Sequence, residues 1–264
     1  AAEADPGILG VHFEGPFLSP EKPGVHDRAM IRTPDIGDLE ILTSLRRGVT
    51  LVTLAPERAP AGFVSALVRA GVRVSLGHSM ATYSQTKAAL AEGLTGFTHL
   101  FNAMRPLASR DPGPIPAALE TAHAYFGMIV DAVHVHPAML RLALRGAAHP
   151  MLVTDAMPPV GGNRAQFMLH GEKIALQSGR CTRSDGALAG TALDMATAVR
   201  NCVEFLDIPL VSALRLASLE PAQFLGLGHS IGRIAPGFRA DLVSFDSPTM
   251  KIHATWVAGK QEPA

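Results

Sequence analysis

The chain has 264 residues, 47% of them hydrophobic and 17% charged, so it can bury a sizeable core, and a disordered protein is excluded. Lysine plus arginine and aspartate plus glutamate each number 23, which leaves no basic surplus for nucleic acid, and no apolar run is long enough to predict a membrane span. Its two cysteines have no metal-type spacing and residues 1–6 show no signal-peptide pattern, so a reducing cytoplasm is expected.

Short apolar runs alternate with helical patterns along most of the chain. The runs that predict buried strands are 8–14, 49–55, 72–78, 96–102, 125–134 and 150–156. The helical patterns between them are 35–47, 61–71, 82–93 and 136–147. This alternation predicts βαβ units and a parallel sheet.

The last third of the chain has a different character. Residues 171–190 form a Gly-rich segment that predicts a hairpin, and 194–206 and 209–227 have helical patterns. Residues 232–260 alternate like antiparallel strands. Two strands alone are marginal, so these strands are expected to need partners that the sequence does not reveal.

Polar side chains lie at or just after the carboxyl ends of the predicted strands. They are Glu14, Glu57, His78, His99, His134 and Asp155. In a βα-barrel all strand ends converge on one face, which carries the active site. In an open sheet, ends far from the switch point do not meet. The pattern therefore favours an α/β fold of the (β/α)8 barrel type, with six of its strands visible.

One carboxylate and two imidazoles in this set suit a divalent metal ion. Glu14, His78 and His99 could bind zinc or a similar ion and leave one position open for water. Such an ion lowers the pKa of bound water towards about 7, and Asp155 could accept the water's proton and deliver it to a leaving group. A lone histidine at a strand end is more often a core or surface residue, so this prediction of metal-assisted hydrolysis depends on the whole set.

A phosphate site is a weaker possibility in the next segment. Asn102 and Ala103 follow the fourth predicted strand, where a turn can aim backbone N–H groups at an anion. Arg110 could add a bidentate phosphate contact. From the residues alone, solvated charges in a proline-rich loop explain Arg105 and Arg110 better.

Six segments in a fixed order carry a family resemblance. They are HFEGPFLSPEKPGVHD (12–27), SLGHSMATYSQTKAALAEGLTGFTHLFNAM (75–104), DAVHVHP (131–137), LVTDAM (152–157), LAGTALDMATAVRN (188–201) and GRIAPGFRADLV (232–243). Together they resemble the N-acetylglucosamine-6-phosphate deacetylase family of the amidohydrolase superfamily. The likeness runs from about Ile8 to Gly259.

The resemblance implies roles for individual residues. It assigns the metal to the three residues named above and proton transfer to Asp155. His26 would polarise the acetyl carbonyl and, with Val25, contact the substrate. Asn102 and Ala103 would contact the phosphate.

Further implied contacts come from other parts of the chain. Arg110 would reach the phosphate of the neighbouring subunit, which implies a homodimer. Further sugar and phosphate contacts would come from Asp131, His134, Leu188, Ala189 and Gly190. From the residues alone, 188–190 is better explained as a flexible turn.

The front of the chain departs from the family pattern. Family members begin with strands of a half-sandwich and two barrel strands, whereas Glu14 lies near residue 1 here. The expected organisation is a hydrolase barrel over 1–231, incomplete at its N-terminus, and C-terminal strands of a small β-sandwich domain over 232–264. In some relatives the first barrel strand carries an H-x-H pair that supports a second metal, and this sequence leaves open whether that pair exists, so one or two ions are expected.

The resemblance implies hydrolysis of N-acetylglucosamine 6-phosphate to glucosamine 6-phosphate and acetate. Zinc is the first choice of metal, and iron, cobalt and manganese suit the same ligands. One alternative is an amidohydrolase for another acylated amino sugar or a cyclic amide. Another is a chain that binds a sugar phosphate without catalysis, or an inactive truncated chain.

Overall fold

A parallel sheet of six strands forms the centre of the computed structural model, which describes residues 5–162 and 164–262. In spatial order the strands are β1 (Gly10–Glu14), β2 (Val49–Leu54), β3 (Arg73–Leu76), β4 (Gly96–Phe97), β5 (Tyr125–Met128) and β6 (His149–Leu152). All neighbouring pairs are parallel. The spatial order follows the chain without the reversal of a doubly wound sheet, as expected for a barrel.

The fourth strand is much shorter than predicted. Only Gly96 and Phe97 pair with the strands on both sides. His99, Phe101 and Ala103 have positive φ angles of 33°, 78° and 47°. Successive left-handed residues cannot continue a strand, so the apolar stretch that follows Phe97 is a series of turns.

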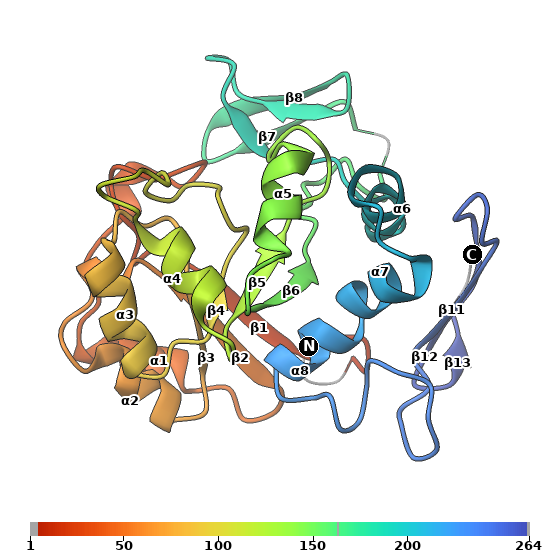
Figure 1. Cartoon of the computed structure of the whole chain (residues 1–264), viewed down its shortest axis with the longest axis horizontal. Coiled ribbons are helices and arrows are strands. Elements are labelled where there is room, and N and C mark those ends of the chain that lie inside the picture. The colour runs from red at the N-terminus through yellow and green to blue at the C-terminus, as the bar shows by residue number, and fades with distance from the viewer. Residues whose placement is uncertain (1–4, 163, 263–264) are drawn as a thin grey trace.

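Eight α-helices accompany the sheets over the described residues (Figure 1). They are α1 (Ile36–Leu42), α2 (Phe63–Arg69), α3 (Tyr83–Ala91), α4 (Pro114–Glu120), α5 (Pro137–Ala143), α6 (Met195–Leu206), α7 (Leu210–Ala217) and α8 (Leu219–Phe224). Capping boxes begin α1 at Asp35 and α3 at Thr82. None of these helices has the length and apolar character needed to cross a membrane.

Two helical details differ from the predictions. The segment expected to be a proline-rich loop contains α4, which begins at Pro114, a position where the missing N–H of proline costs nothing. The single helix predicted over 209–227 is divided at Ser218, whose φ and ψ of −132° and −67° are not helical.

The core lies between the parallel sheet and its helices. Phe97 on β4 and Phe126 on β5 are fully buried, together with Leu54 and Leu76 at the ends of β2 and β3. This continuous apolar core includes residues from almost every βα unit. It holds the ends of the strands in fixed relative positions.

An antiparallel sheet of four strands follows the barrel strands, at the top of Figure 1. Its strands are β7 (Gln166–Leu169), β8 (Glu172–Gln177), β9 (Arg180–Thr182) and β10 (Leu188–Thr191). It has its own small core of Phe167, Ile174, Cys181 and Ala189. The predicted hairpin over 171–190 is therefore part of a larger sheet.

The tail forms a third, separate sheet, on the right of Figure 1. It contains β11 (Leu242–Phe245), β12 (Ile252–Val257) and β13 (Lys260–Gln261), all antiparallel. The two predicted strands thus find a third partner inside this chain. The boundary at residue 231 stays a prediction, and residues 1–4, 163 and 263–264 of the predicted domains lie outside the described residues.

Candidate active site

Three potential metal-binding atoms meet at the carboxyl end of the parallel sheet. Nε2 of His99 lies 3.0 Å from Oε1 of Glu14, and Nε2 of His78 lies 3.2 Å from the same oxygen. The two Nε2 atoms are 3.2 Å apart. Two metal bonds of about 2.0–2.1 Å at a tetrahedral angle separate their ligand atoms by about 3.3 Å, so this triangle has the dimensions of a metal site.

The protonation state of His78 favours a bound cation between these three ligand atoms. Nδ1 of His78 donates to the carbonyl of Lys22 at 2.8 Å, so in the neutral ring Nε2 carries a lone pair and no proton. That lone pair faces the carboxylate of Glu14, an arrangement that only a shared positive charge stabilises. The hydrogen bond of Nδ1 also fixes the orientation of the ring, as expected for a metal ligand.

The pKa shifts of Glu14 and His99 also favour a positive charge within the cluster. Burial raises the pKa of Glu14, but the two imidazoles beside it bring this pKa well below the usual range, so the carboxylate is ionised. Burial lowers the pKa of His99, and contact with Glu14 reverses this effect and raises it. The residues present therefore fit a divalent cation.

The backbone bends sharply where these side chains leave the sheet. His78 follows β3 and His99 follows β4, each by two residues, and Asp155 follows β6 by three. Their φ angles are +49°, +33° and +51°. Each left-handed residue of this kind costs about 1–3 kcal/mol, and such strain is concentrated at functional sites.

Strand β10 supports the backbone around Asp155. The N–H of Thr191 donates to the carbonyl of Asp155 at 2.9 Å, and the N–H of Met157 donates to the carbonyl of Thr191 at 2.9 Å. Gly190 permits this approach, because a Cβ there would lie 2.7 Å from the Met157 side chain and 3.0 Å from the Asp155 carbonyl. Residues 188–191 are thus an ordered strand rather than a flexible turn.

A cavity of about 490 Å³ contains the cluster. Among its lining residues are most of the predicted site residues: Glu14, Val25, His26, His78, His99, Asn102, Ala103, His134, Asp155, Leu188 and Gly190. These predicted residues come from seven segments of the chain. This convergence is the arrangement expected at the mouth of a barrel.

The segment 19–27 covers one side of the cavity. His26 packs its ring edge-on against His78, with 4.9 Å between the ring centroids. The pKa of His26 is lowered to about 4, mainly by burial and also by the neighbouring His78. His26 is therefore a neutral imidazole near pH 7. Val25 packs against the small core of the antiparallel sheet.

Two further segments that line the cavity follow β4 and β5. The side chain of Asn102 donates to the carbonyl of His99 at 3.2 Å, which holds the turn after His99. Nδ1 of His134 donates to the carboxylate of Asp131 at 2.6 Å. This bond orients the His134 ring towards the cavity.

Four of the residues singled out in the sequence do not line the cavity. Asp131 holds His134, and Ala189 is buried in the antiparallel sheet. Arg110 lies on an exposed stretch. Glu57 accepts from the hydroxyl of Ser79 at 2.7 Å and from the N–H of Met80 at 2.6 Å, so it holds the loop that follows His78.

Other lining residues were not predicted. Lys22 contributes the backbone carbonyl that orients His78, and no residue type could have indicated it. Met157 is the last residue of the LVTDAM segment (152–157) and also lines the cavity. His170 lies in the turn between β7 and β8 and also lines the cavity. Its distance from the barrel strands along the chain hid this position.

Comparison with known proteins agrees with this geometry. The model of the amidohydrolase family matches residues 1–261. The chain belongs to the amidohydrolase family. It is 41% identical over 259 residues to an N-acetylgalactosamine-6-phosphate deacetylase of Shewanella sp. (strain ANA-3), covering 97% of this chain and 65% of that protein.

Other relatives of this amidohydrolase are named N-acetylglucosamine-6-phosphate deacetylases. The chain is 38% identical to the one of Vibrio furnissii, covering 96% of this chain and 64% of that protein. The crystal structure of N-acetylglucosamine-6-phosphate deacetylase from Pasteurella multocida superposes with a TM-score of 0.92 at 36% identity, covering 97% of this chain and 68% of that one. The amidohydrolase chain thus spans about two thirds of the length of these relatives, and the predicted fold class is confirmed.

Proposed function

We propose that this amidohydrolase hydrolyses N-acetylglucosamine 6-phosphate to glucosamine 6-phosphate and acetate. The observation that carries the proposal is the meeting of Glu14, His78 and His99 in one cavity with Asp155. A carboxylate and two imidazoles suit a divalent ion in a hydrolytic site. The names of the relatives support an N-acetylated sugar phosphate as the substrate.

Two side chains would handle the protons and the developing charge. A divalent ion, when bound, activates water and polarises a carbonyl. Asp155 accepts a proton from the water as the water oxygen bonds to the acetyl carbon. It then donates this proton to the amide nitrogen as the C–N bond breaks. His26 is neutral above about pH 4 and can donate an N–H to the carbonyl oxygen as negative charge develops there.

The side chains of Glu14, His78 and His99 support zinc as the bound metal. Iron, cobalt and manganese suit the same donor atoms. Metal analysis of protein purified without added ions tests this choice. One equivalent of zinc is the expected result for a site with these three ligands. A second equivalent would require ligands beyond this set.

Comparing phosphorylated and unphosphorylated sugars tests the substrate. We expect N-acetylglucosamine 6-phosphate to be hydrolysed with a kcat/KM at least about 100-fold higher than N-acetylglucosamine, because a lost charged contact costs several kcal/mol. Equal rates, or faster hydrolysis of a cyclic amide, would favour another amidohydrolase activity. Tight binding of the sugar phosphate without turnover would favour a non-catalytic chain.

A second candidate substrate is N-acetylgalactosamine 6-phosphate. The Shewanella relative, at 41% identity, has the name of an enzyme for this epimer. The two sugars differ only at one hydroxyl, while the amide and the phosphate are the same. Measuring kcat/KM for both epimers on one preparation decides between them.

The exposed position of Arg110 supports a proposed homodimer in which each subunit completes the phosphate site of the other. Its side chain is exposed and makes no hydrogen bond or ion pair with another described residue. Asn102 and Ala103 would contact the same phosphate from within the subunit. Mixing Arg110→Ala chains with Asp155→Asn chains should restore activity, because one site of each mixed dimer has both residues intact. No restoration would argue against a shared site.

A cytoplasmic location completes the proposal. Cys181 and Cys202 are both buried and free, which suits a reducing compartment. Fractionation of cells that produce the protein tests this expectation.

A further inference from the structure

The segment 19–27 is attached on its inner side to the cluster of potential metal ligands Glu14, His78 and His99 (the metal-ligand cluster). The N–H of Ser19 donates to the carbonyl of His78 at 2.8 Å, and Nδ1 of His78 donates in turn to the carbonyl of Lys22 at 2.8 Å. A Cβ on Gly24 would lie 2.8 Å from Cε1 of the same ring. The position of this segment is therefore coupled to the geometry of His78.

The outer side of the segment contacts the antiparallel sheet at two places. Val25 packs against the small core of that sheet. Nη1 of Arg183, the residue after β9, lies 3.4 Å from the carbonyl of Gly24 and donates to it. The Val25 contact is apolar and the Gly24 contact is polar. Both lie within the two residues that precede His26.

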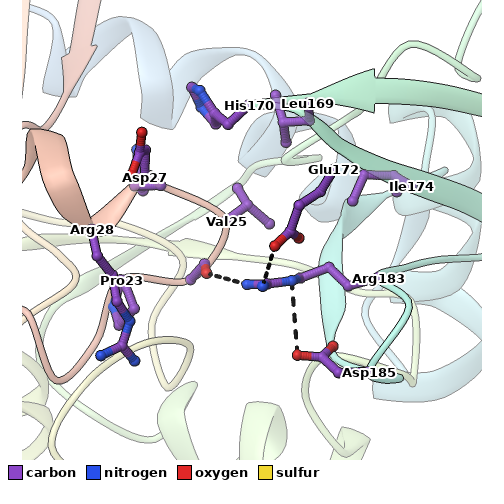
Figure 2. A pocket seen from close by; sticks show the side chains of 12 residues that line it. Pro23, Val25, Asp27, Arg28, Leu169, His170, Glu172, Ile174, Arg183 and Asp185 are labelled. Atoms are coloured by element: carbon purple, nitrogen blue, oxygen red, sulfur yellow. Dashed lines mark hydrogen bonds and ion pairs between the residues drawn. The ribbon is translucent and has the colours of Figure 1, made fainter.

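The guanidinium of Arg183 is hydrogen-bonded to one acidic group and lies near a second. Nη2 donates to Oε1 of Glu172 on β8 at 2.7 Å, and Nε lies 3.9 Å from the carboxylate of Asp185. Figure 2 shows the side chain extending from the sheet to the segment with these partners around it. A planar guanidinium can serve several acceptors at fixed angles, which a lysine amine cannot do.

Arg183 crosses a space rather than a packed interface. A second cavity, of about 450 Å³, lies between the segment and the antiparallel sheet. It shares residues 23–26, Leu169 and His170 with the cavity of the metal-ligand cluster. Solvent-sized space therefore separates the two layers around the Arg183 side chain, which reaches across it to the Gly24 carbonyl.

We propose that Arg183 is a positioning residue that holds the Gly24 carbonyl, and through it Val25 and His26, over the metal-ligand cluster. Glu172 orients the guanidinium for this contact. The catalytic consequence rests on the proposed function, whereas the structural consequence does not. An exposed ion pair alone contributes little to stability, so the effect of Arg183 is expected in the order of the segment rather than in the global stability of the protein.

Amide hydrogen exchange tests the structural part without any substrate. In Arg183→Ala, amides of residues 19–27 should exchange about tenfold faster, while those of β5 and β6 keep their rates. Arg180→Ala is the matched control, because Arg180 is exposed on β9, three residues before Arg183, and its side chain makes no hydrogen bond with the described residues. Unchanged exchange over 19–27 in Arg183→Ala would overturn the proposal.

A second variant guards against a general loss of structure. Glu172→Gln keeps the arginine and removes the charge that orients it, so the same amides should exchange about threefold faster. Faster exchange throughout the molecule in both variants, β5 and β6 included, would show a general structural role and contradict the proposal.

A double-mutant cycle tests whether Arg183 acts through His26. Arg183→Ala should lower kcat about tenfold with a change in KM below about threefold. In the His26→Gln background the same change should lower kcat by less than about twofold. Multiplicative effects would mean that Arg183 acts elsewhere. Absence of deacetylation in the unmodified protein would contradict the proposed function, and the exchange experiment would still decide the role of Arg183.

Discussion

The parallel sheet and the antiparallel sheet supply the cavity in different ways. The metal-ligand cluster and Asp155 leave the parallel sheet within three residues of the strand ends, above a continuous core. The antiparallel sheet has a core of only four buried side chains. It contributes a turn residue, His170, and a strand, β10, to the rim of the cavity.

This difference separates two tasks. Groups that hold a metal ion must keep their positions within a fraction of an ångström, so they belong on the most rigid part of the fold. Groups that cover a substrate must allow it to enter and leave, so they belong on elements with few apolar contacts and low local stability. The following substitutions test the division, beginning with the largest expected effect.

Among substitutions on the parallel sheet, Glu14→Gln should have the largest effect on metal binding and turnover. The amide cannot balance a divalent charge, so bound metal should be lost and kcat should fall by a factor of about 10³ or more. Metal content and turnover measured on the same sample check this. Glu172→Gln, the same change on the antiparallel sheet, should keep its metal. A Glu14→Gln protein with a full equivalent of metal would refute the ligand assignment.

Asp155→Asn separates proton transfer from metal binding. The amide keeps the shape of the side chain but cannot accept a proton, so kcat should fall by a factor of about 10²–10⁴. Metal content and the affinity for the sugar phosphate should be unchanged. Near-normal turnover in this variant would show that another group transfers the proton.

Core truncations compare the stabilities of the two sheets. Phe126→Ala on β5 should lower the free energy of unfolding by about 3–5 kcal/mol, because the side chain is fully buried in the large core. Ile174→Ala on β8 should cost about 2 kcal/mol, since its small cluster can collapse around the gap. Urea unfolding measures both. A larger loss for Ile174→Ala would mean that the antiparallel sheet is not the weaker layer.

The smallest expected effect concerns a charged group on a helix of the barrel. The hydrogen bond from Arg32 lowers the pKa of Asp38, which closes the capping box of α1. A lowered pKa stabilises the fold above the unfolded value of about 3.9, and this stabilisation is lost as the pH falls through the folded value. Asp38→Asn should therefore cost about 1 kcal/mol at pH 7 and less near pH 2, which lies below the unfolded value. Thermal unfolding at the two pH values checks this, and an equal cost at both would exclude the charge as its cause.

Much of the barrel was predictable because its signals are local. A βα unit shows its strand as an apolar run and its helix as a periodic pattern, and both lie within about 25 residues. The chain-order sheet then brings successive strand ends together, so Glu14, His78, His99 and Asp155 could be expected on one face. The short β4 and the helix α4 were missed, because left-handed turns and a proline-led helix are poorly indicated by apolar periodicity.

The sequence by itself determined the strands, the potential metal ligands and the acidic residue beside them, since each depends on a pattern within one or two neighbouring units. Only the tertiary structure decided that Asp131 orients His134, that β10 supports Asp155, and that Arg183 reaches Gly24. The last of these contacts joins residues 159 positions apart in the chain. Such contacts depend on how the antiparallel sheet folds back over the barrel mouth, and no local pattern of residues encodes that closure.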